Sequence, residues 1–234
     1  MLSKLKKDLQ SLANPEKAKV LQKFFKTGKG EYGEGDVFLG IVVPEQRRIA
    51  KKYLGLSFEE LQELLNSKIH EERLIALIIL TELYKKSKKD GLKKRQIFEF
   101  YLNNTKNINN WDLVDLSAPK IIGEFLQKED TGILRQLANS ENLWERRIAI
   151  ISTAPFIRKR SFGETLVISD ILINDGQDLI HKAVGWMLRE VGKRNKNVLE
   201  VFLEQRYKNM PRTMLRYAIE KFPKDEREKW MKTK

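Results

Sequence analysis

An all-α fold of stacked helical pairs is predicted by three features of the 234-residue sequence. Apolar residues recur at spacings of three and four, as at Leu74, Leu77 and Ile78, which is the pattern of an amphipathic helix. No segment shows the regular alternation of apolar and polar residues that marks a half-buried strand. A similar nine-residue motif also recurs four times along the chain. Together these features favour a helical-repeat architecture.

The predicted helices follow one another with connections that contain most of the prolines and glycines. In the first half of the chain they are Pro15–Thr27, Pro44–Leu54, Ser57–Asn66, His70–Lys86, Leu92–Asn104 and Trp111–Gln127. In the second half they are Thr131–Ala138, Asn142–Arg158, Phe162–Ile173, Asp178–Arg194, Val198–Tyr207 and Pro211–Phe222. The connections are marked by Pro15, Pro44, Gly91, Gly132, Gly176 and Pro211. These helices form about six pairs.

The recurring motif defines the class of repeat. Its copies are "ERLIALIIL" (72–80), "NWDLVDLSA" (110–118), "RRIAIISTA" (146–154) and "HKAVGWMLR" (181–189), and their starts are 38, 36 and 35 residues apart. A period in the high thirties with two helices per unit is typical of a HEAT-like solenoid, an α-α superhelix with a concave face. We therefore expect a single HEAT-like repeat domain over residues 1–234, with the four motif helices lining one surface.

One segment, "KTGKGEYGEGDVFLGIVV" (26–43), interrupts the helical pattern with five glycines between Gly28 and Gly40. A glycine-rich loop can bind phosphate through its backbone N–H groups. However, the segment lacks the Gly-Lys-Ser/Thr of a Walker A motif and the GxGxxG of a βαβ nucleotide site. We expect a long flexible connection between helices that lies outside any catalytic centre.

Composition excludes several classes of protein. The chain has no cysteine, which excludes disulfides and thiolate metal sites, and it has only two histidines, which argues against a multi-histidine metal centre. No apolar run approaches the ~18–20 residues of a membrane helix. The first residues, "MLSKLKKDLQSLANPEKAK", are too charged for a signal peptide. We expect a cytoplasmic protein without metal, cofactor or membrane partner.

The charge points to a polyanionic partner. Lysine and arginine number 45 against 32 acidic residues, for a net charge of +13. Nucleic acid is the first candidate for such a partner, and the alternative is an ordinary basic protein from a lysine-rich proteome. The net charge is +5 over residues 1–90, +1 over 91–140 and +7 over 141–234. The middle of the chain is therefore nearly neutral between two basic flanks.

This neutral region contains an unusual cluster in "NNWDLVDLSAP" (109–119). Asp112 fits the first turn of a helix, where the helix dipole favours negative charge. Asp115 is harder to explain, because it lies between apolar residues and shares a helix face with Trp111, four residues earlier. The pair is either a functional indole and carboxylate, or a packing tryptophan followed by a surface acid with a basic partner. Trp144, Trp230 and His181 are interpreted as packing or capping residues.

Three segments carry a resemblance to a known family: "NNWDLVDLSAP", "LWERRIAI" (143–150) and "HKAVGWMLREVGKR" (181–194). In this order along a HEAT-like array, the sequence resembles the AlkD-type DNA alkylation repair proteins, a bacterial family of HEAT-like repeat DNA glycosylases. The similarity extends from "NPEKAK" (14–19) to the C-terminal helices. It implies a monomeric, cofactor-free enzyme that hydrolyses the N-glycosidic bond of alkylated purines in double-stranded DNA, nucleoid-associated while it acts.

The resemblance also implies roles for individual residues. The catalytic positions of the family match Asp115, Trp111, Trp186 and Arg147. Its backbone-binding basic positions match Arg189 and Lys193, and Arg146 precedes Arg147. A track of DNA phosphates could extend over the basic residues Lys182, Arg189, Lys193, Arg194, Arg212 and Arg216. The chain departs from the family pattern at Phe24, where the family has a tyrosine, and in the glycine-rich segment.

Chemistry favours Asp115 as the main catalytic group. An N3- or N7-alkylated purine is already cationic and leaves as a neutral base, so the enzyme needs negative charge near the sugar C1′ and a positioned water. Asp112 is the second choice for this role. Two alternatives stay open: a non-enzymatic binder of damaged or branched DNA, and a helical-repeat interaction scaffold. The alternative for Arg146–Arg147 is an ordinary solvated pair.

Overall fold

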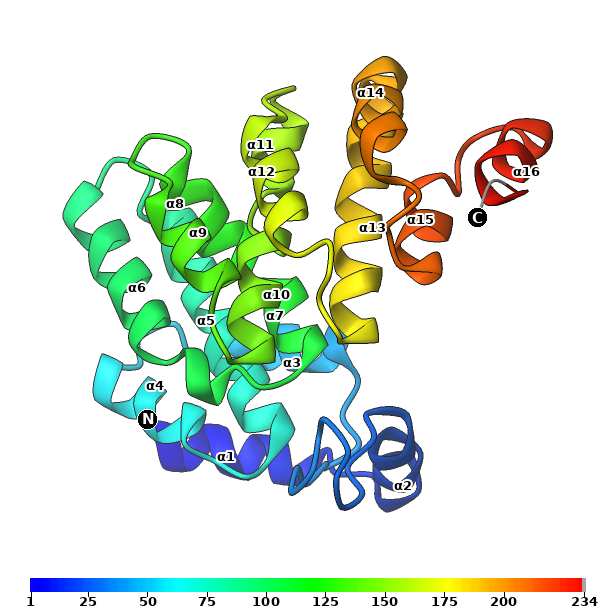
Figure 1. Ribbon diagram of the computed structural model, residues 1–234. Helices are drawn as coiled ribbons and strands as arrows, with labels where there is room; N and C mark the ends of the chain where they lie inside the picture. Colours follow the sequence, from blue (N-terminus) through cyan, green and yellow to red (C-terminus); the bar gives the residue numbers. More distant parts are fainter. Residues whose placement is uncertain (233–234) are drawn as a thin grey trace. The chain divides into compact units, whose positions relative to one another are not determined.

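The computed structural model describes residues 1–232, and within these residues it contains helices and no β-strand (Figure 1). The predicted all-α helical-repeat class is confirmed. A single parallel bridge joins Val37 to Ile69. None of the helices within residues 1–232 combines the length and apolar character needed to cross a bilayer. The chain divides into two compact units, Met1–Ser117 and Ala118–Lys234, which we describe separately.

The first unit contains the N-terminal helices. They are α1 (Leu2–Ser11), α2 (Pro15–Phe24), α3 (Val43–Ala50), α4 (Phe58–Leu65), α5 (His70–Lys86), α6 (Gly91–Asn103), a 3₁₀ turn η1 (Thr105–Asn107) and α7 (Trp111–Ala118). Helix α5 matches its predicted bounds. Helix α1 was not predicted, although it buries Leu2, Leu5 and Leu9.

Helix α5 is the centre of the first unit. Its residues from His70 to Thr81 are buried on every side, as expected for a helix surrounded by neighbours. Helices α3 and α4 pack directly against it. Helix α4 begins with a capping box in which the Ser57 hydroxyl accepts from Glu60 N–H and the Glu60 carboxylate accepts from Ser57 N–H. The core of the first unit is therefore built around α5, with α3 and α4 packed on it.

The second unit contains the remaining helices. They are a π-helical turn η2 (Pro119–Gly123), α8 (Glu124–Leu126), α9 (Gly132–Ala138), α10 (Leu143–Ile151), α11 (Ala154–Arg158), α12 (Gly163–Ile171), α13 (Asp178–Arg194), α14 (Lys196–Arg206), α15 (Arg212–Ala218) and α16 (Lys224–Lys232). Helix α13 matches its predicted bounds, and α16 was not predicted. Gly185 allows α15 to approach α13, because a Cβ there would lie 2.5 Å from both the carbonyl oxygen of Met214 and the Cβ of Tyr217.

Prolines explain two differences from the predicted helices. Pro119 has no N–H to donate to the carbonyl four residues earlier, and the predicted helix Trp111–Gln127 widens there into the π-helical turn. Pro155 acts similarly, and the predicted helix Asn142–Arg158 is divided at Ser152–Thr153 into α10 and α11. The apolar pattern continues through both breaks, so periodicity alone did not reveal them.

The prediction of one continuous domain is not tested by the division into two units. Each repeat of a solenoid contacts only its neighbours, so a continuous stack also separates into compact parts. The concave face is a property of the whole stack and stays a prediction.

Candidate functional site

Helix α7 places Trp111 and Asp115 one turn apart in the first unit. Asn110 is fully buried before the helix, where its side-chain oxygen accepts from Trp111 N–H at 2.8 Å and its carbonyl accepts from Val114 N–H at 3.2 Å. Trp111 and Asp115 are both partly exposed. The predicted pair, Trp111 and Asp115, is thus partly exposed on a helix whose first turn is held by the buried Asn110.

The indole of Trp111 ends a stack of aromatic rings. It lies parallel to Phe25 at 5.1 Å, Phe25 lies parallel to Phe38 at 5.1 Å, and Phe38 lies parallel to the imidazole of His70 at 4.5 Å. Phe24 meets the indole edge-on at 5.9 Å, and its side chain is 61% exposed. The partial burial of Trp111 therefore results from ring stacking at one face of a small aromatic cluster.

Asp115 lies within the electrostatic reach of Tyr101. Burial raises the pKa of the Tyr101 phenol, the hydrogen bond with Ser117 lowers it, and the negative charge of Asp115 raises it further. The phenol oxygen lies 2.9 Å from Ser117 Oγ. A phenol with a raised pKa stays protonated at neutral pH, so Asp115 has a neutral hydroxyl rather than a second anion on this side.

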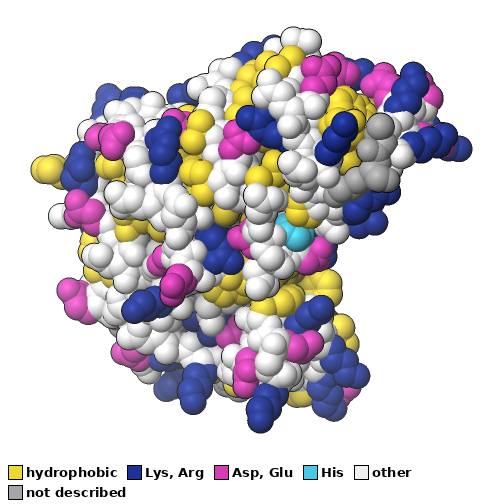
Figure 2. Space-filling model, in the orientation of Figure 1, with side chains coloured by type: hydrophobic (Ala, Val, Ile, Leu, Met, Phe, Trp, Pro, Cys, Tyr) yellow, Lys and Arg dark blue, Asp and Glu magenta, His cyan; other side chains and the backbone are white. Residues whose placement is uncertain are grey.

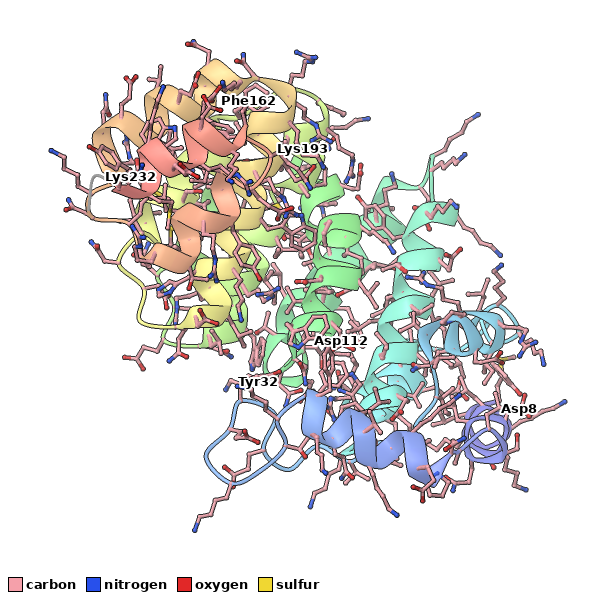
Figure 3. The ribbon with its side chains drawn as sticks, turned by 90° about the vertical axis from the view of Figure 1, so that its right-hand side faces the viewer. Asp8, Tyr32, Asp112, Phe162, Lys193 and Lys232 are labelled. Atoms are coloured by element: carbon pink, nitrogen blue, oxygen red, sulfur yellow. The ribbon has the colours of Figure 1, made fainter. Side chains whose placement is uncertain are left out.

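Asp112 has different surroundings, which argue against it as the alternative to Asp115 for the catalytic carboxylate. It is 8% exposed, and its Oδ2 lies 2.8 Å from His70 Nε2. The other imidazole nitrogen, Nδ1, lies 3.3 Å from Asp36 Oδ2, and Asp36 also forms an ion pair with Arg73 at 2.7 Å. Asp112 is thus part of a buried ionic network. Figure 3 labels Asp112 among the side chains of this unit.

The charges of this network are mutually stabilised. Burial would lower the pKa of His70, but hydrogen bonds to Asp112 and Asp36 outweigh it, and the pKa is raised. Burial likewise opposes ionisation of Asp36, yet the hydrogen bond from His70 and the charge of Arg73 lower its pKa. Two cations therefore face two carboxylates inside the first unit, which is the pairing that buried charges require.

The end of the glycine-rich segment is anchored within the first unit, whereas the expected flexibility of its Gly28–Gly35 part stays a prediction. The Glu71 carboxylate accepts from the backbone N–H groups of Leu39, Gly40 and Ile41 at 2.9, 2.8 and 3.2 Å. Gly40 has φ +83, and a Cβ there would lie 2.2 Å from the Asn14 carbonyl oxygen. At the tip, the Tyr32 hydroxyl lies 3.5 Å from the Phe24 carbonyl oxygen (Figure 3).

Arg146 and Arg147 in the second unit are both engaged with the protein itself. Arg147 is 5% exposed and donates from Nη1 to the carbonyl of Leu179 at 2.6 Å. Arg146 pairs with Asp175 at 2.6 Å and donates to two carbonyls of the preceding turn. They are not the ordinary solvated pair that was the alternative interpretation. Trp144, one turn before Ile148, is buried as expected of a packing residue.

Helix α13 carries Trp186, which is partly exposed, and four of the predicted DNA-binding cations. Each of these cations has an acidic partner on the protein. Lys182 pairs with Asp178 at 2.7 Å, Lys193 and Arg194 pair with Glu190 at 2.9 and 3.0 Å, and Arg189 pairs with Glu220.

The two predicted cations of α15 differ. Arg212 donates to the carbonyl of Met231 in α16 at 2.7 Å. Arg216 is exposed and makes no ion pair with the residues that the structure describes. It borders a hollow of about 670 Å³ between α15 and α16 that is also lined by Lys224 and Arg227.

A second group of cations was not predicted. The side chains of Lys17, Lys23, Lys26 and Lys29 on α2 and the following loop are exposed and have no acidic partner within residues 1–232. Figure 2 shows the lysine and arginine side chains gathered over α2 at the lower right. The sequence signal was available, since "KAKVLQKFFKTGK" (17–29) contains no acidic residue.

The predicted site residues therefore fall into two groups. Trp111 and Asp115 lie together on α7 in the first unit. Arg146, Arg147, Trp186 and the remaining predicted cations lie in the second unit. Their assembly into one site stays a prediction.

Comparisons with solved structures agree with the helical-repeat fold. A predicted DNA alkylation repair enzyme from Enterococcus faecalis aligns with a TM-score of 0.68 and 19% identity over 91% of this chain and 97% of its own. AlkD2 from Streptococcus mutans aligns with a TM-score of 0.57 and 19% identity over 90% and 99%. The protein smu.31 from Streptococcus mutans UA159 aligns with a TM-score of 0.57 and 20% identity over 77% and 92%. At these identities the likeness establishes the fold alone.

Sequence comparison adds the family. No curated protein matches the chain. The profile of the family described as "DNA alkylation repair enzyme" matches residues 5–222. Because this match spans far more than half of the sequence, the chain belongs to the DNA alkylation repair enzyme family.

Proposed function

We propose that the protein is a DNA glycosylase that hydrolyses the N-glycosidic bond of cationic N3- or N7-alkylated purines in duplex DNA. The observation that carries this proposal is the partly exposed carboxylate of Asp115 one helical turn after the partly exposed indole of Trp111. A partly exposed carboxylate one turn from an aromatic side chain suits a reaction in which positive charge develops on a sugar.

The reaction breaks the bond between the sugar C1′ and the purine nitrogen. The electron pair of the C1′–N bond moves onto the purine, which leaves as a neutral molecule, and the sugar becomes oxocarbenium-like. The ionised carboxylate of Asp115 stabilises this cation, orients a water toward C1′ and accepts the proton that the water loses. No general acid is needed, because the leaving base is already activated by its alkyl group.

The indole has a supporting role in this mechanism. An indole face attracts a cation with roughly 0.5–2 kcal/mol. Trp111 is suited to contact the sugar or the alkylated base, since its opposite face is already occupied by Phe25. We assign the same role to Trp186 on α13, which is partly exposed. Arg147 is 5% exposed and donates to the Leu179 carbonyl, so we assign it to holding α10 against α13 rather than to contacting the DNA strand.

Duplex DNA is held mainly through its phosphates in this proposal. The unpaired lysines of α2 and its loop supply positive charge beside Trp111, and the cations of α13 and α15 supply the remainder. The protein acts as a monomer in the cytoplasm, without a metal or an organic cofactor.

The test is release of free base. Purified protein is incubated in excess over a duplex that contains 7-methylguanine or 3-methyladenine, and the released base is measured under single-turnover conditions with binding measured in parallel. Enzymatic release supports the proposal. Binding without release from any alkylated duplex would move the assignment to a non-enzymatic DNA binder. Absence of both would favour an interaction scaffold.

A further inference from the structure

One buried histidine joins the glycine-rich loop to the helix that carries Trp111. His70, at the start of α5, is 2% exposed, and its two ring nitrogens face carboxylates from different segments. Nε2 lies 2.8 Å from Asp112 on α7, and Nδ1 lies 3.3 Å from Asp36 in the loop. An imidazole with a carboxylate at each nitrogen acts as a donor twice, which only its protonated form can do.

The first connection runs through the backbone of α7. Asp112 is the residue after Trp111. Its Oδ1 accepts a hydrogen bond from Leu113 N–H at 2.8 Å, and its Oδ2 is hydrogen-bonded to His70 Nε2. A carboxylate held at both oxygens cannot rotate without the loss of one bond. The bond to His70 therefore fixes the first turn of α7, from which both the indole and, one turn later, Asp115 project.

The second connection runs through aromatic rings. The imidazole of His70 stacks on Phe38, Phe38 stacks on Phe25, and Phe25 stacks on the indole of Trp111. Phe25 and Phe38 are 7% and 6% exposed. His70 and Trp111 are thus connected by two routes, one through Asp112 and one through the rings of Phe38 and Phe25. Together these five residues form a closed circuit of contacts.

The loop can support this circuit because it is itself anchored. The backbone of Val37 accepts from His70 N–H at 2.8 Å and donates to the Lys68 carbonyl at 3.0 Å. Three further backbone N–H groups are bound by Glu71, which is 1% exposed. Asp36 and Phe38 are consequently held on either side of Val37 and reach His70 from a fixed segment.

We propose that His70 is a positioning residue for Trp111 and Asp115, and that the glycine-rich loop serves as its second support. The effect on base excision rests on the glycosylase proposed above. The effect on the indole does not, because it follows from the contacts alone. His70 itself touches neither DNA nor the reacting atoms.

The experiment replaces His70 by glutamine, whose amide can still donate to Asp112 but cannot also reach Asp36 or stack on Phe38. Acrylamide quenching of tryptophan fluorescence is measured for the wild type and for His70→Gln. Each is compared with the same protein carrying Trp111→Phe, so that the difference isolates the emission of Trp111. Base release and DNA affinity are measured on the same preparations. Asp36→Asn serves as a second variant, because Asp36 is the loop carboxylate that contacts His70.

We expect both variants to increase the quenching of Trp111, to slow excision by roughly tenfold to a hundredfold and to leave DNA affinity nearly unchanged, since small misplacements of catalytic groups have effects of this size. Leu80→Ala is the control, because it removes a fully buried side chain from α5 outside the circuit. It should destabilise the protein without altering the quenching of Trp111. The effects of His70→Gln and Asp112→Asn on quenching should be less than additive, because both residues belong to the same circuit of contacts.

Unchanged Trp111 quenching in folded His70→Gln and Asp36→Asn would overturn the positioning role, whatever happens to activity. Equal changes in Leu80→Ala would also overturn it, since the effect would then reflect general loosening. If the wild type releases no base, the glycosylase fails, and the quenching comparison still decides whether His70 positions the indole.

Discussion

Asp112 and Asp115 lie three residues apart on α7, and their surroundings predict different effects of the same substitution on stability. Asp115→Asn keeps the shape of a partly exposed side chain but removes its charge. We expect excision to slow about a hundred- to thousandfold, because one preorganised electrostatic group contributes roughly 3–4 kcal/mol to the transition state. DNA affinity and the urea midpoint should change little. Single-turnover base release and urea unfolding measure the two properties.

Asp112→Asn is the matched comparison for that prediction. Asp112 is buried against His70, so its loss should lower the free energy of unfolding by about 1–3 kcal/mol, the range for a broken buried hydrogen bond to a charged group. Equal excision rates for Asp115→Asn and the wild type would remove Asp115 from the mechanism.

The histidine network predicts a pH dependence of stability. The pKa of His70 is raised above 6.5, so its contribution is complete below that pH and is lost as pH rises through the folded-state pKa. The pKa of Asp36 is lowered below 3.8, so its contribution is present above that pH and is lost as pH falls through its folded-state pKa. Stability from this network should therefore be greatest between pH 3.8 and pH 6.5.

The measurement is urea unfolding of the wild type and His70→Gln from about pH 5 to about pH 9, on the alkaline side of the histidine titration. The groups that face the imidazole are Asp36 from the loop, Asp112 from α7 and Arg73 from α5. The difference in stability between the two proteins should shrink as pH rises. A constant difference would contradict a charged His70.

At the scale of elements, the glycine-rich loop predicts a contrast between two glycines with nearly equal φ. Gly40 (φ +83) has the Asn14 carbonyl oxygen 2.2 Å from the position of a Cβ, whereas Gly35 (φ +84) has open space there. Gly35→Ala should cost roughly 1–2 kcal/mol, the strain of a left-handed conformation. Gly40→Ala should cost several kcal/mol more, because it also displaces the backbone that Glu71 binds. Urea midpoints of the two variants give the comparison, and equal losses would show that the docking against Asn14 is unimportant.

Long helices were the elements that the sequence predicted best. Helices α5 and α13 each run for 17 residues without an internal proline, and their bounds agree with the prediction. Helix α1 was missed although Leu2, Leu5 and Leu9 have helical spacing, because the segment was considered only as a possible signal peptide. The prediction merged the short helices around Pro119 and Pro155 with their neighbours, since the spacing of apolar residues does not show where a backbone N–H is missing.

The site could be predicted only where its residues are close in sequence. Trp111 and Asp115 are four residues apart, so helical geometry related them directly. The bond from His70 to Asp112 spans 42 residues, and the anchoring of Gly40 by Glu71 spans 31. Neither contact leaves a periodic signal, and His70 was therefore considered only as a possible metal ligand. The docking of the loop is a tertiary effect that its glycine content did not reveal.

For the whole molecule, the proposal predicts that DNA affinity falls steeply with salt, with a slope near −0.9 per phosphate contact on a log–log plot. Lys29→Glu should reduce the slope by about 1 and weaken binding to all sequences equally, as expected for a phosphate contact. Filter or fluorescence titrations at several salt concentrations provide the data. Affinity that is insensitive to salt would count against phosphate binding.

A second prediction at this scale uses the internal partners of the α13 cations. Glu190→Gln releases Lys193 and Arg194 from their ion pairs. DNA affinity should rise by roughly two- to fivefold, since a surface ion pair is worth about 0–1 kcal/mol. Glu200→Gln is the matched control, because it changes the net charge equally but its partner Lys196 is not among the predicted DNA contacts and keeps its ion pair with Glu226. An equal rise in both variants would indicate a general charge effect instead.

The carboxylates that hold the cations of α13 also bear on how this protein would search a genome. Each carboxylate competes with a phosphate from within the same molecule, so a cation that leaves the DNA is recaptured at once by its own neighbour. Contacts to undamaged duplex are then individually short-lived, and encounters end before they delay the search. Under the proposed function, a lesion that also engages Trp111 and Asp115 adds contacts beyond those with phosphate, and the residence time would lengthen only there.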